Sequence, residues 1–167
     1  MSRRYNELNF GRGQQELEAG DERYGDHRAA EIRAAWFEDD AGERTNAVAQ
    51  DDGCAACFEV LFHRELENPV FLVTLLNDVG IAVFAASTHW SKPDTGFFHA
   101  GQTVEVRVRF DNRLAPSTYR LTPGIACAGL GADTLDMRPD LASLLVHGTR
   151  FTGGAADLRH EFRIEPV

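Results

Sequence analysis

At 167 residues, 43% of them hydrophobic, the chain is long enough for one domain with a sizeable core. The net charge of −9 opposes binding to nucleic acid and to anionic lipid surfaces, because the protein and such partners repel each other. There is no run of 18 apolar residues, and the N-terminus lacks the apolar core of a signal peptide. Neither a membrane-spanning helix nor a secretory leader is therefore expected.

The N-terminal stretch differs in composition from the rest of the chain. Residues 1–24 are polar and contain three glycines, which interrupt helix formation. A segment of this kind buries too little apolar surface to fold alone. We therefore expect a linker or tail over 1–24 and one folded domain over 25–167.

Short strand-like runs separated by turns follow from about residue 30. The run 32–37 ends at residues 39–42, whose Asp-Asp-Ala-Gly sequence is a strong turn signal. Residues 57–64 alternate in character. One face of this second predicted strand carries Phe58, Val60 and Phe62.

The run 70–76 is apolar on both faces and is joined to the run 81–86 by a hairpin signal at 77–80. In a two-sheet sandwich, one face of each strand should meet solvent. The outer face of this strand therefore needs a cover. The candidates are the loop 87–102, a ligand or a second protein chain.

Four further elements complete the predicted order. A strand over 103–110 should turn its valines and Phe110 inward, and a strand over 118–126 follows it. Residues 138–146 suggest a helical turn, and the last strand is expected over 158–165, with Leu158, His160, Phe162 and Ile164 on one face. Seven or eight short strands at this spacing predict an all-β fold, an antiparallel two-sheet β-sandwich of immunoglobulin-like or jelly-roll type.

Catalytic motifs are absent from the sequence. It has no phosphate-binding loop and no Gly-x-Ser-x-Gly nucleophile motif, and its six histidines are scattered. The three cysteines, Cys54, Cys57 and Cys127, are too few for a disulfide framework and are expected to be plain thiols in a reducing compartment. The sequence thus predicts no enzyme activity, no metal and no cofactor.

The segment 87–93 places His89 and Trp90 among hydroxyl side chains at the end of a predicted strand. Aromatic faces stack on the apolar C–H faces of sugar rings, while nearby polar groups bond the sugar hydroxyls. The alternative is a Trp that plugs the end of the sandwich. Trp36 is open to the same two interpretations.

Several stretches resemble one known family in their order and spacing. They are Arg23-Tyr24-Gly25-Asp26, Glu67-Asn68-Pro69-Val70-Phe71, Asn77-Asp78 with Gly80-Ile81, Ala100-Gly101-Gln102-Thr103-Val104 and Ser117-Thr118-Tyr119. Over about 23–165, the chain is similar to the C-terminal carbohydrate-binding domain of Wzt-type ATPase subunits of O-antigen ABC transporters. Ser117-Thr118 departs from the glycine that the family usually has before the tyrosine.

The resemblance implies a non-catalytic module that recognises an exported O-antigen-type polysaccharide. It also implies a homodimer, nucleotide-binding and membrane subunits as partners, and a cytoplasmic location at the inner membrane through the transporter. The tail over 1–24 would then follow a nucleotide-binding domain. An assembly domain that dimerises without sugar affinity, and an enzyme on a jelly-roll scaffold, remain as alternatives.

The family's ligand residues vary with the glycan, so the expected site comes from this sequence. We place it on the outward side of the runs 70–76 and 81–86, together with the segment after them. The guanidinium fork of Arg120 would suit a charged or phosphorylated glycan terminus. The predicted carbohydrate-binding residues are Leu72, Thr74, Phe84, His89, Trp90 and Arg120.

Overall fold

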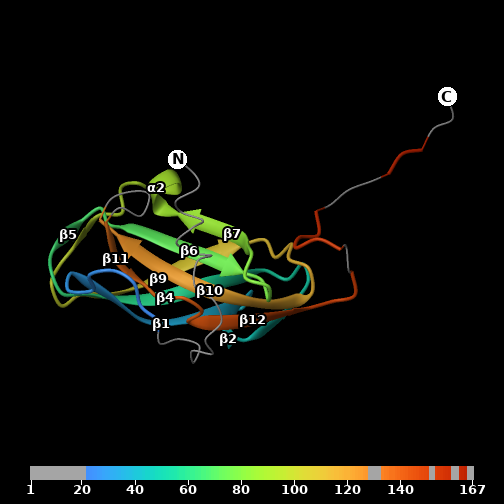
Figure 1. The fold of residues 1–167 in the computed structure, drawn as a ribbon, viewed down its shortest axis with the longest axis horizontal. Coiled ribbons are helices and arrows are strands. Elements are labelled where there is room, and N and C mark those ends of the chain that lie inside the picture. The colour runs from blue at the N-terminus through green and yellow to red at the C-terminus, as the bar shows by residue number, and fades with distance from the viewer. Residues whose placement is uncertain (1–21, 128–132, 151–152, 159–161, 165–167) are drawn as a thin grey trace.

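Two β-sheets packed face to face form the body of the protein in the computed structural model, which describes residues 22–127, 133–150, 153–158 and 162–164 (Figure 1). The smaller sheet has the order β2 (Arg44–Thr45), β1 (Ala30–Asp39), β4 (Cys54–Phe62) and β9 (Thr103–Phe110). The larger has the order β3 (Ala47–Ala49), β12 (Ala142–His147), β10 (Ser117–Ala126), β6 (Val70–Leu76) and β7 (Ala82–Ser87), with β11 (Thr134–Met137) also paired to β10. The predicted all-β sandwich is confirmed.

Among the described strands, β12 and β3 run parallel and the other pairs are antiparallel. A separate two-stranded ribbon joins β5 (Leu66–Glu67) to β8 (Phe97–Phe98) at one end of the sandwich. The helix α2 (Thr88–Ser91) follows β7. No helix in the described ranges has the length and apolar character that a membrane span requires.

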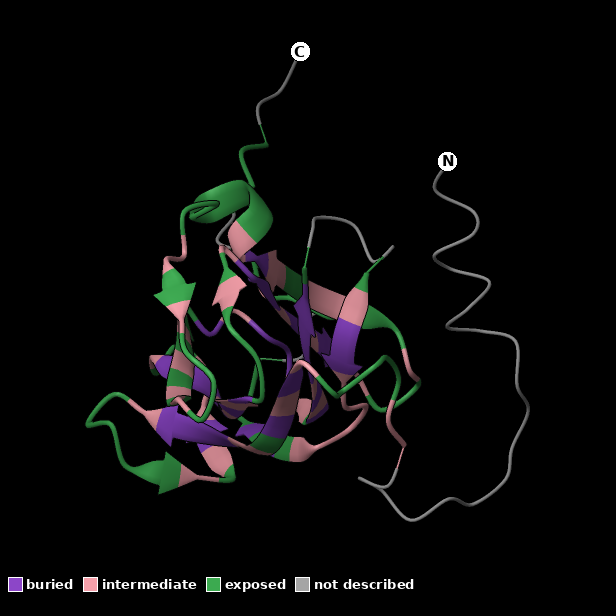
Figure 2. Ribbon diagram, turned by 90° about the vertical axis from the view of Figure 1, so that its left-hand side faces the viewer, coloured by how far each residue is buried: buried purple, intermediate pink, exposed green. Residues whose placement is uncertain are grey.

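The buried stretches of the strands lie where the two sheets face each other (Figure 2), and phenylalanines make up much of this core. Phe58, Val60 and Phe62 of β4 are fully buried, as their alternation predicts. The ring of Phe62 stacks on Phe98 at 4.6 Å between centroids, and Phe98 meets Phe71 edge-on at 5.8 Å. The β5–β8 ribbon therefore closes one end of the core.

Strand β9 lies at the edge of the smaller sheet, because it pairs only with β4. Val104, Val106 and Val108 pack against the core, as predicted, but they stay half-buried. An edge strand has a neighbour on one side only, so its inward side chains remain partly exposed to solvent.

Tyr119 ties the start of β10 to the preceding loop. Its buried phenol donates hydrogen bonds to the carbonyl oxygens of Ala115 at 2.7 Å and Ala155 at 3.3 Å. A tyrosine whose hydroxyl bonds the backbone a few residues upstream is a feature of immunoglobulin-like sandwiches. The same hydroxyl holds the C-terminal stretch near Ala155 against this loop.

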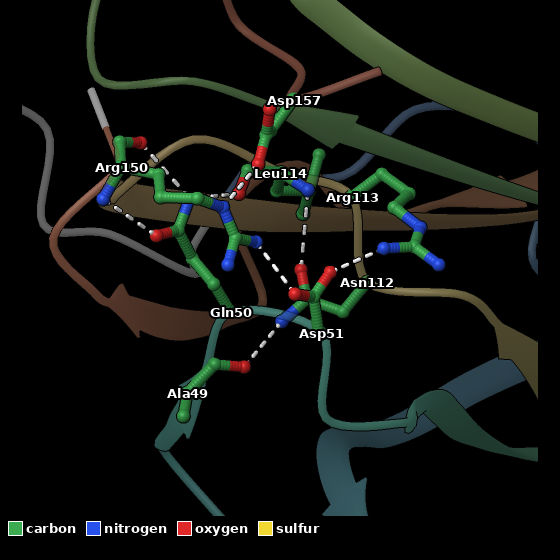
Figure 3. Close-up of polar contacts among 8 residues, drawn as sticks. All are labelled: Ala49, Gln50, Asp51, Asn112, Arg113, Leu114, Arg150 and Asp157. Carbon is green, nitrogen blue, oxygen red and sulfur yellow. Dashed lines mark hydrogen bonds and ion pairs between the residues drawn. The ribbon is translucent and has the colours of Figure 1, made fainter. Parts of the chain in front are cut away.

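A polar network at the loop end of the sandwich connects segments that are far apart in the sequence (Figure 3). Asp51 forms ion pairs with both Arg113 and Arg150, and Arg150 also pairs with Asp157 at 2.6 Å. Backbone bonds support these contacts, since the amide of Asp157 donates to the carbonyl of Arg113 at 2.6 Å. The network positions residues 153–157 against the loops that contain Asp51 and Arg113.

Arg23 and Tyr24, at the end of the predicted tail, dock on β11. Tyr24 and Met137 exchange backbone hydrogen bonds at 2.9 and 2.8 Å. The Nε of Arg23 lies 3.0 Å from the Oδ1 of Asp136, a fully buried carboxylate whose pKa is raised by burial. Residues 1–21, the rest of the predicted tail, lie outside the described residues.

The helical turn predicted over 138–146 is wrong. Residues 142–147 form β12 instead, with Leu144 and Val146 buried between the sheets. Asp140 takes a positive φ of 53°, which is a turn conformation rather than a helical one. The period of two in 142–147 matches a strand at the surface of a core, and β10 supplies its hydrogen-bonding partner.

The last predicted strand, over 158–165, is also wrong for the residues that the structure describes. Leu158, Phe162 and Ile164 are 71, 83 and 92% exposed and belong to no strand, while His160 lies outside the described residues. Alternation belongs to one chain, but a strand also needs a neighbour to pair with. The described residues beyond Asp157 instead lead away from both sheets (Figure 1).

Candidate functional site

The outer face of the larger sheet is built mainly by β6 and β10. On β6, Leu72, Thr74 and Leu76 point outward and are half-buried, while the residues between them are buried in the core. Thr74 lies directly opposite Thr122 of β10. Two hydroxyl groups therefore sit side by side at the centre of this face.

An ion pair occupies one end of the same face. The Nη1 of Arg120 lies 2.7 Å from the Oδ2 of Asp140, and its Nη2 donates to the carbonyl of Asn77 at 3.3 Å. The Nε of Arg120 is buried and bonds to no described atom. Asp140 is held in turn, because its amide donates to the hydroxyl of Thr122 at 3.2 Å. Arg120 thus has a fixed orientation, with a buried Nε–H that bonds to no described atom.

The other end of the face is apolar. A Cβ added at Gly124 would lie 3.6 Å from Leu72 and 3.7 Å from the terminal methyl of Met137. The absence of a side chain at Gly124 lets Leu72 and Met137 pack close above the sheet. The outer face therefore runs from an apolar end through two threonines to a charged end, and β11 extends the sheet beside the apolar end.

His89 and Trp90 lie on α2, near the apolar end. The hydroxyl of Ser87 caps the helix by accepting from the amide of His89 at 3.2 Å, and Thr88 accepts the amide of Phe71 at 3.0 Å. Trp90 is 68% exposed, and its ring meets His89 edge-on at 6.2 Å. The interpretation of Trp90 as a plug for the sandwich is therefore wrong.

The structure divides the six predicted site residues into three groups. Leu72, Thr74 and Arg120 share the outer face. Leu72 pairs with Ser87, next to α2, whereas Arg120 pairs with Leu76. Four residues of strand separate these positions, about 13 Å at ~3.3 Å per residue, so His89 and Trp90 lie at the end remote from Arg120.

Phe84 does not belong to the outer face, contrary to the prediction. It lies opposite Leu75 of β6, on the inner side of the sheet, and its ring stacks on Phe110 at 5.1 Å between centroids. A register irregularity lies between the pairings of Leu75 and Leu76 with β7. Such a shift changes which side chains face inward, and the alternation of 81–86 alone does not reveal it.

A second organised cluster, absent from the predicted site, lies on the outer face of the smaller sheet. Trp36 is only 9% exposed, and the guanidinium of Arg44 lies 4.0 Å above its ring centroid. The indole N–H donates to Glu38 at 2.9 Å, and Arg107 binds both oxygens of that carboxylate at 2.8 and 3.1 Å. The hydrogen bonds from Arg107 and Trp36 lower the pKa of Glu38.

Part of this cluster could have been predicted from the sequence. Trp36 lies in the predicted strand 32–37 and Glu38 follows directly after it, so the two would share a face if the strand continued by one residue. Arg107 lies on the polar face of the predicted strand 103–110. The sequence does not reveal the order in which the strands pair. In the structure, β4 lies between β1 and β9, and this order aligns Trp36, Cys57 and Arg107 in one row.

The cysteines form neither a redox pair nor part of a metal site. Cys54 faces the main core and Cys57 packs with Trp36 on the opposite face of β4. Burial raises the pKa of Cys54 to about 12 and that of Cys57 to about 11, so both remain protonated thiols near neutral pH. Among the described residues, no group of three or more His, Cys, Asp or Glu could hold a metal ion.

Two hollows in the described structure differ in size and in lining. One, of about 70 Å³, lies between the sheets beneath α2 and is lined by Phe58, Phe71, Val73, Ala86, Ser87, Thr88, Ser91, Val106 and Val108. The other is an open cleft of about 340 Å³, lined by Asp39, Asp40, Gly53, Cys54, Arg109, Phe110 and Asp111. The cleft is the polar one and is large enough for several water molecules or a small polar ligand.

Comparisons with known proteins agree with this architecture. The model of the Wzt C-terminal domain family matches residues 21–158. The crystal structure of the C-terminal domain of wzt superimposes with a TM-score of 0.76 at 17% identity, over 89% of this chain and 90% of that chain. This likeness concerns the fold alone. A comparison with curated protein sequences finds no match.

Proposed function

Because this chain belongs to the Wzt C-terminal domain family, we propose that it is a non-catalytic module that binds an O-antigen-type polysaccharide. In this proposal, glycan binding couples the polysaccharide to an ABC transporter. The family match over residues 21–158 is the observation that carries the proposal.

The outer face of the larger sheet offers suitable chemistry for a glycan. Thr74 and Thr122 present paired hydroxyls that exchange hydrogen bonds with sugar hydroxyls. Arg120 adds a guanidinium suited to a charged or phosphorylated terminus, and the exposed Trp90 offers an aromatic face at the other end. Such a surface binds an extended chain rather than a single deeply buried sugar.

The remaining parts of the proposal concern its setting. Residues 1–24 connect the domain, defined as 25–167, to a preceding nucleotide-binding domain. Nucleotide-binding and membrane subunits of the transporter are then its partners. The module lies on the cytoplasmic side of the inner membrane, held there through the transporter.

Titration calorimetry with polysaccharide purified from the organism that encodes the chain tests the proposal. We expect saturable binding that is lost with a polysaccharide of a different repeat. Arg120→Ala should raise Kd about tenfold or more, since hydrogen bonds to charged groups contribute about 1.5–3 kcal/mol. Arg33→Ala, on the other sheet, should leave Kd unchanged. Absence of binding by the unmutated protein would refute the proposal.

A second candidate function is assembly through a homodimer. Leu158, Phe162 and Ile164 are apolar and largely exposed, and Leu145 of β12 is 48% exposed on the outer face of the larger sheet. Apolar surface of this kind is commonly buried in an interface. We propose that a second copy of the chain covers it.

Light scattering after size exclusion distinguishes the two functions. Replacement of Leu158, Phe162 and Ile164 by Ser should convert a dimer to a monomer. If the dimer forms and no polysaccharide binds, the assembly function replaces glycan recognition. A strict monomer at high protein concentration rules out the dimer.

A further inference from the structure

Trp36 is a buried indole on the side of a sheet that should face solvent. In a two-layer sandwich only the inner faces of the sheets are covered by the other sheet. Trp36, Ala55 and Cys57 nevertheless form a small buried cluster, separate from the main core, on the outer face of the smaller sheet. A long charged side chain, that of Arg44, lies over the ring.

This cover is removable. Arg44 is exposed on the two-residue strand β2, and within the described chain its guanidinium forms no hydrogen bond or ion pair, only the stack at 4.0 Å on Trp36. A cation–π contact at an exposed site is weak, and exposed side chains change rotamer within nanoseconds. Rotation of Arg44 alone would uncover one face of the indole.

The ring beneath the cover is rigidly held. Its N–H bonds Glu38 at 2.9 Å, and the bidentate contact of Arg107 fixes that carboxylate. Arg107 is fixed further by Glu105 at 2.7 Å. An aromatic face that needs no reorientation loses little entropy when a ligand stacks on it. Polar groups at its edge are also available to sugar hydroxyls.

The surface continues toward the polar cleft. The cross-strand row next to Trp36, Cys57 and Arg107 contains Glu38, Ala55 and Arg109, and Arg109 lines the cleft of about 340 Å³. The acidic residues that line this cleft are Asp39, Asp40 and Asp111. Three carboxylates against one guanidinium disfavour an anionic sugar and suit the hydroxyls of neutral sugars, which donate to carboxylates.

We propose that Trp36 and the adjoining cleft form a second glycan-contact subsite, which takes neutral sugar residues of the polysaccharide. Arg44 caps the indole in the free protein and leaves it when a sugar ring stacks there. This inference rests on the proposed function, since it assigns a second surface for the same ligand. In this proposal, neutral sugars of the polysaccharide bind at Trp36, and a charged terminus binds at Arg120.

Fluorine NMR tests the subsite, because Trp36 and Trp90 are the only tryptophans in the chain. The full chain labelled with 5-fluorotryptophan gives two resonances, assigned with Trp36→Phe and Trp90→Phe. The unmutated protein is titrated with oligosaccharides released from the polysaccharide of the encoding organism, in parallel with calorimetry. We expect the Trp36 resonance to shift saturably, over the concentrations at which calorimetry shows binding.

Arg44→Ala tests the cap. Removal of the competing guanidinium should lower the midpoint of the Trp36 shift about two- to fivefold, the factor that matches an exposed cation–π contact. Arg33→Ala, a control on the same smaller sheet, should leave the midpoint unchanged. An unchanged or higher midpoint for Arg44→Ala overturns the role of Arg44 as a cap.

The outcomes separate this inference from the proposed function. Calorimetric binding with no shift at Trp36 refutes the second subsite and leaves glycan recognition in place. A shift at Trp36 alone supports the subsite and removes Trp90 from the glycan-binding surface. If calorimetry shows no binding at all, the proposed function and the subsite both fail.

Discussion

At the scale of single residues, the hydroxyl of Tyr119 connects elements that are far apart in sequence. It donates to the carbonyls of Ala115 and Ala155 from a fully buried position. Tyr119→Phe keeps the ring but leaves these acceptors without that donor. We expect a loss of about 1–2 kcal/mol in the free energy of unfolding, measured by urea denaturation.

Tyr24→Phe is the matched control for Tyr119. Tyr24 is 55% exposed, and its hydroxyl donates to a surface carboxylate, that of Glu22, at 3.1 Å. Its loss should change the free energy of unfolding by less than about 0.5 kcal/mol. Equal effects of the two substitutions would contradict the structural role assigned to Tyr119.

Glu38 should make the stability of the protein depend on pH in the acid range. Arg107 and the Trp36 indole lower its pKa in the folded state, so its contribution is present above the ordinary value of 4.5 and is lost as the pH falls through the lowered value. The melting temperature of Glu38→Gln should therefore fall less between pH 6 and pH 3 than that of the unmutated protein.

The exposed Glu43 serves as the control for Glu38. Glu43→Gln should keep the acid dependence of the unmutated protein, because its carboxylate accepts no hydrogen bond from the described residues. If the melting temperature of Glu38→Gln falls as much between pH 6 and pH 3 as that of the unmutated protein, the charged contact of Glu38 with Arg107 contributes nothing to stability.

Trp90 separates binding from stability. Its ring is 68% exposed, so Trp90→Ala should leave the melting temperature within about 1 °C of the original. If the ring stacks on sugar, the same change should raise Kd about fivefold, since such a contact contributes about 1 kcal/mol. Trp90→Phe should retain most of the affinity. A large fall in melting temperature for Trp90→Ala would instead indicate a packing role.

At the scale of elements, β6 shows how one apolar run meets two environments. Leu75 is fully buried between the sheets, whereas Leu76 points to the outer face and is half-buried. Leu75→Ala should reduce the free energy of unfolding by about 2–5 kcal/mol, and Leu76→Ala by about 1 kcal/mol or less. Similar losses in urea denaturation would indicate that the outer face is covered as fully as the core.

The strands that sequence reasoning missed or misassigned share a physical cause. Residues 138–146 were expected to include a helical turn, yet 142–147 form a strand whose side chains alternate between buried and exposed. Residues 158–164 also alternate, yet none of the described ones lies in a strand. Pairing partners come from distant parts of the chain, so alternation alone predicts which face is apolar and not whether the strand forms.

At the scale of the whole molecule, the network in Figure 3 should hold the C-terminal stretch against the loop end of the sandwich. Arg150→Ala removes its ion pairs with Asp51 and Asp157. Hydrogen exchange should then become faster at the amides of Ala115 and Asp157, which bond Ala155 and Arg113 across this contact.

Arg33→Ala controls for the loss of a surface arginine elsewhere, and it should leave exchange at Ala115 and Asp157 unchanged. Unchanged exchange in Arg150→Ala would mean that the backbone bonds and Tyr119 suffice to hold this stretch.

The sequence by itself determined the fold class and the inward faces of β4 and β9, because alternation and turn residues are local properties of a chain. The order and spacing of several short stretches also indicated the family. It also brought Leu72, Thr74 and Arg120 into one predicted site. Only the tertiary structure decided that Phe84 faces inward, that Trp90 is exposed, and that Arg44, Trp36, Glu38 and Arg107 meet. Strand order and register are long-range choices, made by how two whole sheets pack, and a single strand's residues do not encode them.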